Sequence, residues 1–257
     1  MKKILLILVA GLILISIFAF YYNNNPKIII SFLLKKGGFK QGDLIYRVNL
    51  FGIIPVANAV FKAERIEEYN SQKVYHLSAT AQSLKIFSKF FSGYAALDSY
   101  IDIQTHNPIL FKEKTIITDK KAVNKEVLYD HKNGVMNISG VKRQIFPDTQ
   151  DPLSSMFNIR YMNFDNKKDL EMNINTNQKN YVLKGTAEHK DISVNKKIYK
   201  TVFLRADIRR KDKNPYHQSK ITMVLLKEEE NIPILIKVFA SGFLINAKLI
   251  DINDRNY

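Results

Sequence analysis

The chain has 257 residues, of which 46% are hydrophobic, and its 39 basic and 24 acidic residues give a formal net charge of +15. This length allows a sizeable core, built as one large β domain or two smaller ones. Because there is no cysteine, disulfides, thiolate catalysis and cysteine-ligated metal sites are excluded. The basic residues are spread along the chain without a recognised nucleic-acid-binding motif. We therefore expect no nucleic-acid partner, and only a weak attraction to anionic lipid head groups.

The N-terminus predicts an export signal or a membrane anchor. Met1-Lys2-Lys3 precedes an apolar run from Ile4 to Phe20, a pattern typical of secretory signals and N-terminal anchors. The run is at the short end of the length that spans a bilayer, and Tyr21 and Tyr22 suit an interfacial aromatic anchor. No Ala-x-Ala cleavage site is present. We expect residues 1–22 to form an uncleaved apolar helix, with a cleaved signal as the alternative; in both cases the rest lies outside the cytoplasm.

The remaining chain divides into a short connecting segment and one domain. Residues 23–36 start with a polar linker and continue as an amphipathic run that is too short to cross a membrane. This run predicts a brief helix. No second linker and no repeat of fixed period follow, so residues 37–257 are expected to form a single β domain.

Alternating apolar and polar residues predict roughly a dozen short strands in this domain. The first of them spans residues 44–50, and Asn133-Gly134 is the strongest hairpin signal in the chain. Pro55, in the second arm of the first hairpin, predicts an edge strand or a bulge. Residues 82–91 suggest a second small helix or turn. Many short strands with polar turns favour an antiparallel sandwich or a strongly curved sheet over a parallel α/β fold.

A short helix is predicted in the middle of the chain. Asp151 can act as its N-cap, and Pro152 then occupies the first helical position, where a missing N–H costs nothing. The next positions form an apolar face that ends in a cation, made of Leu153, Met156, Phe157 and Arg160. A lone helix in a β-rich chain has to bury such a face against a sheet.

Four groups of residues, in matching order, resemble one protein family. They are Gly42-Asp-Leu-Ile-Tyr-Arg-Val48 with Gly52, Leu97-Asp-Ser-Tyr-Ile-Asp102 with Pro108 and Phe111, Asp151-Pro-Leu-Ser154 with Ile159-Arg160, and Ile232-Pro-Ile-Leu-Ile-Lys237 with residues 242–249. The family is the bacterial envelope group known as domain of unknown function 3108, and the resemblance covers about residues 38–250. The chain departs from the family pattern in two places: it lacks a second glycine in the first hairpin and a tryptophan before the closing proline.

The resemblance implies an exported, largely antiparallel β protein and brings no catalytic residue with it. Together with the central helix, it leads us to expect a mainly β fold. The expected sheet is one large, curved antiparallel sheet with the shape of a half-barrel or a clam. It would hold a short central helix and would be preceded by an N-terminal apolar helix. The expected location is the periplasmic face of a bacterial cell envelope, with the chain anchored by residues 1–22.

Arg160 is the candidate ligand-binding residue. An arginine on an apolar helix face can hold a phosphate or carboxylate head group through its planar fork. The favoured alternative is structural, with Arg160 pairing with the helix dipole or with a buried carboxylate such as Asp98. Asp151, Pro152, Leu153, Ser154 and Phe157 are expected to form a structural motif.

The remaining candidates favour neither a metal nor catalysis. Asp98, Asp102 and His106 are spaced four apart, but Asp102 can equally cap the turn before Pro108, so we expect no metal site. Ser154 and Ser155 lack the flanking glycines of a nucleophile elbow. No acid–base or nucleophile pair has a workable spacing, so we expect no enzyme and no cofactor.

Two hypotheses for the function follow. In the first, the concave face of the sheet binds an apolar ligand such as a lipid acyl chain, with the central helix filling part of the concavity. In the second, the chain is a non-catalytic structural or interaction protein whose sheet edge or basic face binds another envelope protein.

Overall fold

The computed structural model describes residues 21, 24–36, 38, 42–62, 65–87, 92–118, 120–165, 168–176, 179–211, 218–228 and 230–254. The predicted apolar helix of residues 1–22 therefore lies, except for Tyr21, outside the described residues. Within the described ranges, none of the helices has the length and apolar character needed to cross a membrane.

The described strands form one antiparallel sheet. Its strand order is β10-β11-β12-β13-β14-β15-β1-β2-β4-β5-β6-β7-β8-β9, and β3 pairs with β4 beside this path. The strands are β1 (Gly42–Leu50), β2 (Ile54–Phe61), β3 (Arg65–Tyr69), β4 (Gln72–Ser83), β5 (Gly93–Asp102), β6 (Pro108–Ile117), β7 (Val123–Asp130), β8 (Val135–Ile138), β9 (Val141–Gln144), β10 (Asp169–Thr176), β11 (Lys179–Val194), β12 (Lys197–Arg210), β13 (Gln218–Lys227), β14 (Asn231–Ala240) and β15 (Phe243–Asp254). Apart from the pairing of β1 with β15, neighbouring strands follow closely in sequence, as in a meander.

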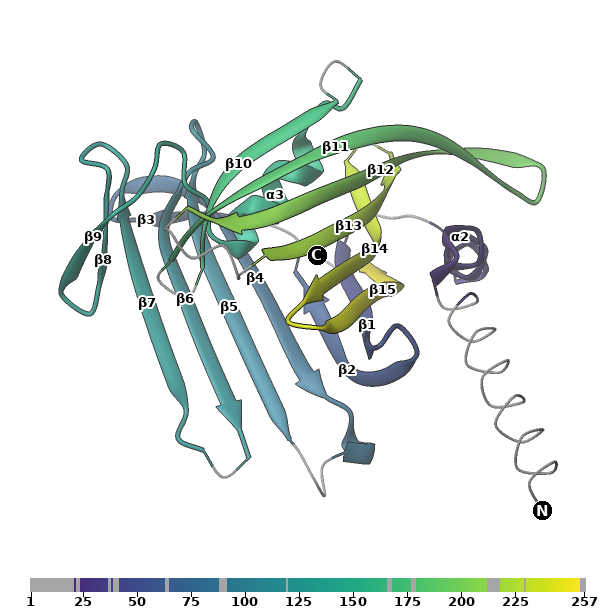
Figure 1. Cartoon of the computed structure of the whole chain (residues 1–257), viewed down its shortest axis with the longest axis horizontal. Helices are drawn as coiled ribbons and strands as arrows, with labels where there is room; N and C mark the ends of the chain where they lie inside the picture. Colours follow the sequence, from purple (N-terminus) through teal and green to yellow (C-terminus); the bar gives the residue numbers. More distant parts are fainter. Residues whose placement is uncertain are drawn as a thin grey trace.

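The sheet curls until its two ends approach each other (Figure 1). The segment between β9 and the central helix lies against β10 and β11 and joins these ends. The side chain of Asn180 donates to the carbonyl of Gln144 over 2.9 Å, and that of Asn173 donates to the carbonyl of Pro147 over 2.7 Å. Gln150 then forms a parallel bridge with Ile174. The open sheet is thus closed by backbone and amide contacts, without a continuous strand pair.

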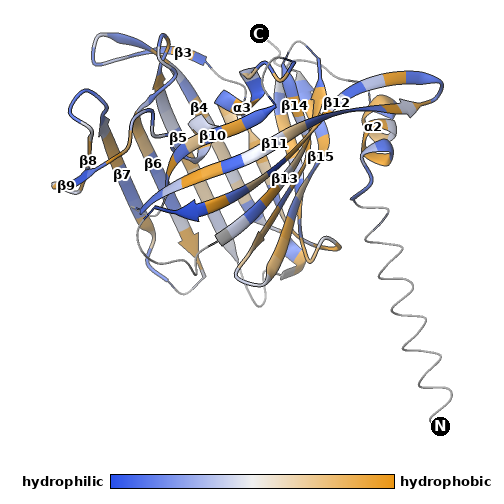
Figure 2. Cartoon of the chain, turned by 45° about the horizontal axis from the view of Figure 1, so that its top comes forward, coloured by the Kyte–Doolittle hydropathy of each residue, from blue (hydrophilic) through white to orange (hydrophobic). Residues whose placement is uncertain are grey.

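Within the described residues, two α-helices accompany the sheet. They are α2 (Pro26–Lys35) and α3 (Pro152–Tyr161), and a single 3-10 turn, η1 (Lys85–Phe87), follows β4. Helix α2 confirms the predicted brief helix; it is capped by the Asn25 side chain and has Pro26 in its first turn. Figure 2 shows its apolar and polar sides. A small helix or turn was predicted over residues 82–91. The described residues of this range form the end of β4 and then η1.

The two helices lie on opposite faces of the sheet. The Arg160 guanidinium of α3 lies 5.8 Å from the ring centre of Phe61, which pairs with Leu44 on β1. Asn246, which pairs with Asn49 of the same strand, instead donates to Asn24 just before α2. Because successive residues of a strand point to opposite faces, these contacts place α3 and α2 on different sides. Helix α3 touches β4, β5, β10 and β14, so its side is the concave one.

Most strand predictions are confirmed, and the differences have local causes. Asn133-Gly134 closes the β7–β8 hairpin, with Gly134 at φ +64°. Pro55 agrees with the prediction: it lies where the β1–β2 register shifts, a bulge, and outside Ala57–Phe61, the part of β2 that pairs with β4. The short strands β3 and β9 were not predicted, because each offers too few alternating apolar positions.

Candidate ligand-binding site on the concave face

The N-terminus of α3 is fixed to β5 by a buried carboxylate. Asp151 is the N-cap, as predicted: one carboxylate oxygen accepts the backbone N–H groups of Leu153 and Ser154 over 2.7 and 2.9 Å. The N–H of Asp151 donates in return to the Ser154 hydroxyl, which completes a capping box. The second carboxylate oxygen accepts the Ser99 hydroxyl of β5 over 2.5 Å. The cap therefore also ties the helix to the sheet.

Burial sets the electrostatics of this cap. Asp151 and Ser99 are fully buried. Burial raises the pKa of Asp151 to about 6, although the hydrogen bonds from Ser99, Ser154 and Leu153 act to lower it. Burial also raises the pKa of the Tyr129 phenol well above its ordinary value, and the nearby Asp151 charge adds to this shift. The sequence marked Asp151 as a cap but gave no sign of its burial.

Helix α3 is buried on most of its surface, not on a single face. Leu153 and Phe157 belong to one hydrophobic cluster, and Ile159 belongs to a second one with residues of β10–β13. The Phe157 ring lies 5.3 Å from that of Tyr75 on β4 and meets the His106 ring edge-on. The expectation of one apolar face against one sheet surface is therefore too simple, because the curved sheet surrounds the helix.

Arg160 lies at the C-terminal end of α3 and is only 5% exposed. Its guanidinium forms an ion pair with Glu230 of the β13–β14 turn, and the Tyr161 hydroxyl donates to the other oxygen of this carboxylate over 2.8 Å. The suggested partner Asp98 is wrong: its carboxylate is 2.9 Å from Nε2 of His76. Successive residues of a strand point to opposite faces. Because the Ser99 side chain points towards α3, the side chain of the neighbouring Asp98 faces away from the helix.

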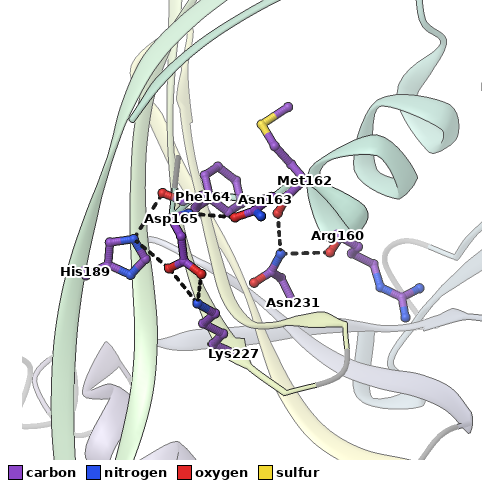
Figure 3. Close-up of polar contacts among 8 residues, drawn as sticks. All are labelled: Arg160, Met162, Asn163, Phe164, Asp165, His189, Lys227 and Asn231. Atoms are coloured by element: carbon purple, nitrogen blue, oxygen red, sulfur yellow. Dashed lines mark hydrogen bonds and ion pairs between the residues drawn. The ribbon is translucent and has the colours of Figure 1, made fainter. Parts of the chain in front are cut away.

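The chain that leaves α3 is held by side chains of three strands (Figure 3). The Asn231 amide of β14 donates to the carbonyls of Arg160 and Met162 over 2.9 and 3.0 Å. Lys227 of β13 pairs with the Asp165 carboxylate over 2.6 Å, and its hydrogen bond lowers the pKa of that group. His189 of β11 lies 3.1 Å from the carbonyl oxygen of Phe164. Both ends of the helix are thus fixed to the sheet.

Away from α3, the concave face carries small apolar side chains. Ala59 pairs directly with Ala81, and Ala81 with Ala95, so three alanines lie side by side across β2, β4 and β5. They share the face of Phe61, because Ala59 is two residues before it on β2. All three are partly exposed, whereas Leu77, on the same face of β4 near the helix, is fully buried.

A second row continues this surface across neighbouring strands. Ala57 pairs with Val48, Val48 with Ala247, and Ala247 with Ile236, which extends the row from β2 through β1 and β15 to β14. These four residues are also partly exposed. We call the two rows together the apolar strip: Val48, Ala57, Ala59, Ala81, Ala95, Ile236 and Ala247. Sequence reasoning missed it, although Ala57-Asn-Ala59 and Ala79-Thr-Ala81 show its period of two.

The other candidate residues do not converge on a site. Asp102 caps the turn before Pro108 by accepting the N–H groups of Gln104 and Thr105. The described residues hold no group of three His, Asp or Glu side chains arranged to bind a metal. Ser154 takes part in the capping box. The hydroxyl of Ser155 donates to the Pro152 carbonyl of its own helix.

The comparisons with known proteins agree with this fold. The family described as a protein of unknown function, DUF3108, matches residues 45–242. The crystal structure of a β-barrel-like protein of domain of unknown function DUF1849 from Brucella abortus is similar, with a TM-score of 0.55 and 13% identity. The match covers 82% of this chain and 97% of that one. No curated protein matches the chain. The resemblance stated from the sequence is thereby confirmed: the chain belongs to the DUF3108 family of proteins of unknown function.

Proposed function

We propose that this chain is an exported, membrane-anchored binding protein of the bacterial cell envelope that holds an apolar ligand on its concave sheet face. The apolar strip carries this proposal. Five of its seven side chains are alanines, and all seven are partly exposed although they lie on the same face as the core. Apolar surface left open on a concave face is typical of a ligand site. The proposed location in the cell envelope is inferred from the sequence, in which Lys2 and Lys3 precede the apolar run of residues 4–20.

The dimensions of the strip favour a hydrocarbon chain. It crosses six adjacent strands, from β5 to β14, and neighbouring strands are about 4.8 Å apart, so it extends over roughly 24 Å. One leaflet of a bilayer core is roughly 15 Å thick, so the strip is long enough for one acyl chain. Each methylene that such a chain buries contributes about 0.8 kcal/mol. A lipid acyl chain is therefore the ligand that we propose.

Arg160 is the residue that we propose for the polar end of the ligand. Its guanidinium lies beside Phe61, at the α3 end of the concave face. A phosphate or carboxylate head group would suit its planar fork but would have to compete with Glu230. The role is non-catalytic in this proposal, since the hydroxyl groups and carboxylates around α3 cap and anchor the helix.

Filling the strip tests the proposal. The full chain is purified gently from membranes and examined by native mass spectrometry. Wild type is expected to carry a bound lipid, and Ala81→Trp is expected to lose it because the indole occupies the centre of the first alanine row. Thr80→Trp is the matched control, since Thr80 is the adjacent residue on the opposite face. Lipid-free wild type, or equal retention by both variants, would rule the ligand site out.

The same native mass spectra test whether Arg160 binds the lipid head group. Arg160→Gln and Glu230→Gln each break the ion pair, so both should lower the melting temperature. Only Arg160→Gln should lose an anionic lipid if Arg160 binds the head group. Equal lipid retention by the two variants would leave Arg160 a purely structural role.

The alternative proposal, a non-catalytic interaction protein of the envelope, has one observation in its favour. Edge strand β9 (Val141–Gln144) is exposed at all four residues, and an open edge can pair with another chain. Lys142 and Arg143 in this strand weaken the argument, because charged residues protect edges from such pairing. Capture of an envelope protein by cross-linking through β9, with lipid-free wild type, would favour this alternative.

A further inference from the structure

The sheet has an end that faces away from α3. Helix α3 lies near the β5–β6 and β13–β14 turns, where Asn158 donates to the His106 carbonyl and Arg160 pairs with Glu230. Antiparallel strands reverse at each turn, so the β1–β2, β4–β5, β6–β7 and β14–β15 connections lie at the other end. In Figure 1 the ends of β4 and β6, which lead into two of these connections, point downwards, away from α3.

This end is apolar at its surface. Exposed large hydrophobic residues lie in these connections and at the strand ends beside them: Phe51, Ile54, Ile86, Tyr94, Ile116, Val123, Phe239, Phe243 and Ile245. We call this set the apolar rim. Ile86 is 77% exposed, and the exposed rings of Phe51 and Phe243 lie 5.9 Å apart across two neighbouring turns. Such a concentration of exposed apolar surface marks an interaction site.

Charge at the rim is positive. Lys85, Lys120 and Lys121 are exposed in the β4–β5 and β6–β7 connections. In the sequence, the four connections contain one acidic residue, Asp119, against four lysines. Apolar side chains flanked by lysines suit the interface of an anionic bilayer, where acyl boundary and head groups meet.

The N-terminal segment joins the domain at this same end. The side chain of Asn24 donates to the carbonyl of Gly52 in the β1–β2 turn and accepts from Asn246. Helix α2 then runs away from the rim, because Lys36 beyond its end pairs with Asp251 near the far end of β15. In the sequence, the apolar run of residues 4–20 ends four residues before Asn24, which contacts the β1–β2 turn.

We propose that the apolar rim rests on the bilayer that holds the N-terminal anchor, so that the concave face opens towards the membrane. This inference depends on the anchor in the proposed function and adds an orientation to it. The apolar strip runs alongside the rim, a few residues away on each strand: Val48 is three residues from Phe51, and Ala247 is four from Phe243. An acyl chain could pass from the membrane onto the strip without crossing water.

Single-cysteine labelling tests the orientation, because the chain has no cysteine of its own. The full chain is reconstituted into phosphatidylethanolamine vesicles with a minor fraction of phosphatidylglycerol. A nitrobenzoxadiazole label is attached at Ile86→Cys, or at Val123→Cys, which is farther along the sheet from the β1–β2 turn. Ile66→Cys is the matched control, an isoleucine 64% exposed on β3. Quenching is measured with doxyl groups on the lipid chains.

Both rim labels are expected to lose most of their fluorescence, and the Ile66→Cys label to keep it. Equal quenching at all three sites, or at none, would overturn the orientation. Quenching at Ile86→Cys alone would show tethering without contact along the rim, and would also overturn it. The lipid-binding proposal fails separately: a quenched rim with no lipid in the native mass spectra would leave the membrane contact standing and remove the ligand.

Discussion

At the scale of single residues, Asp151 is the point on which the central helix depends. Its carboxylate satisfies two helix N–H groups and a hydroxyl on β5 while it is fully buried. A buried charge is unfavourable even when it is hydrogen-bonded, and the raised pKa of about 6 expresses this cost. The cap therefore stabilises the helix but gives the fold a dependence on pH.

Asp151→Asn isolates this dependence. The pKa in the folded protein, about 6, lies above the ordinary value of 3.8, so the folded state binds the proton more tightly than the unfolded state. Stability from this group is then present below pH 4 and is lost as the pH rises to about 6. Asparagine can cap a helix but does not titrate. The free energy of unfolding of wild type, relative to Asp151→Asn, should fall by on the order of 3 kcal/mol, at about 1.4 kcal/mol per pKa unit.

Urea denaturation of both proteins at a series of pH values measures this difference. Other titrating groups contribute equally to the two proteins and cancel in the comparison. Parallel stability curves between pH 4 and 7 would show that Asp151 keeps an ordinary pKa, and that its carboxylate is not held in a dry site.

The two ends of α3 show what sequence can reveal at this scale. The Asp151-Pro152 start was predictable because a cap is local: donor and acceptor are two or three residues apart. Arg160 was recognisable as a special residue, but its partner Glu230 lies 70 residues away. Only the order of the strands brings the β13–β14 turn next to the helix, and no spacing in the sequence encodes that.

At the scale of secondary-structure elements, α3 is the piece that fills the curved sheet at one end. The Phe157 ring contacts Tyr75 of β4, His106 of the β5–β6 connection and Tyr161 of its own helix. The helix thus joins β4 and β5 to β10 and β14 on the far side of the concavity. Its side chains cover the part of that face near the β5–β6 and β13–β14 turns and leave the apolar strip partly exposed.

Phe157→Ala tests this packing. Removing a large buried ring should lower the free energy of unfolding by about 3–5 kcal/mol, a large part of a typical domain's stability. Ile66→Ala is the control, and because its side chain is exposed it should change stability by less than about 0.5 kcal/mol. Thermal or urea denaturation measures both. A neutral Phe157→Ala would mean that the helix is not packed inside the sheet.

Most strands and helices were predictable from the sequence, and those that were missed share a physical cause. Strands whose sequence alternates cleanly between apolar and polar residues, such as β1 and β12, were recognised from that alternation. In contrast, β9 has four exposed residues and β3 only five residues in all, so neither carries a burial pattern. The burial of α3 on most sides was also hidden, because its inner serines, Ser154 and Ser155, look like surface residues.

At the scale of the whole molecule, strand order decides which residues meet. The pairing of β1 with β15 brings Val48 beside Ala247 and makes the apolar strip continuous across six strands. The segment before α3 then joins the two ends of the sheet. Neither feature follows from the sequence pattern, which predicts curvature and strand number but not which distant strands pair.

The same topology links the proposed site to the proposed membrane contact. The strip, the rim and the attachment of the N-terminal segment all lie towards the end of the sheet that α3 leaves open. A ligand lying along the strip, across the strands, would have α3 on one side and the bilayer on the other. The location of the ligand is therefore the point on which the whole proposal depends.

Photo-cross-linking with an acyl chain that carries a diazirine near its middle measures this location. The full chain in vesicles is irradiated, digested, and mapped by tandem mass spectrometry. We predict adducts on concave-face residues of β2, β4 and β5, centred on Ala59, Ala81 and Ala95, and their loss in Ala81→Trp. Adducts confined to α2 or to convex-face positions such as Thr80, unchanged in Ala81→Trp, would contradict the proposal that the concave face binds lipid.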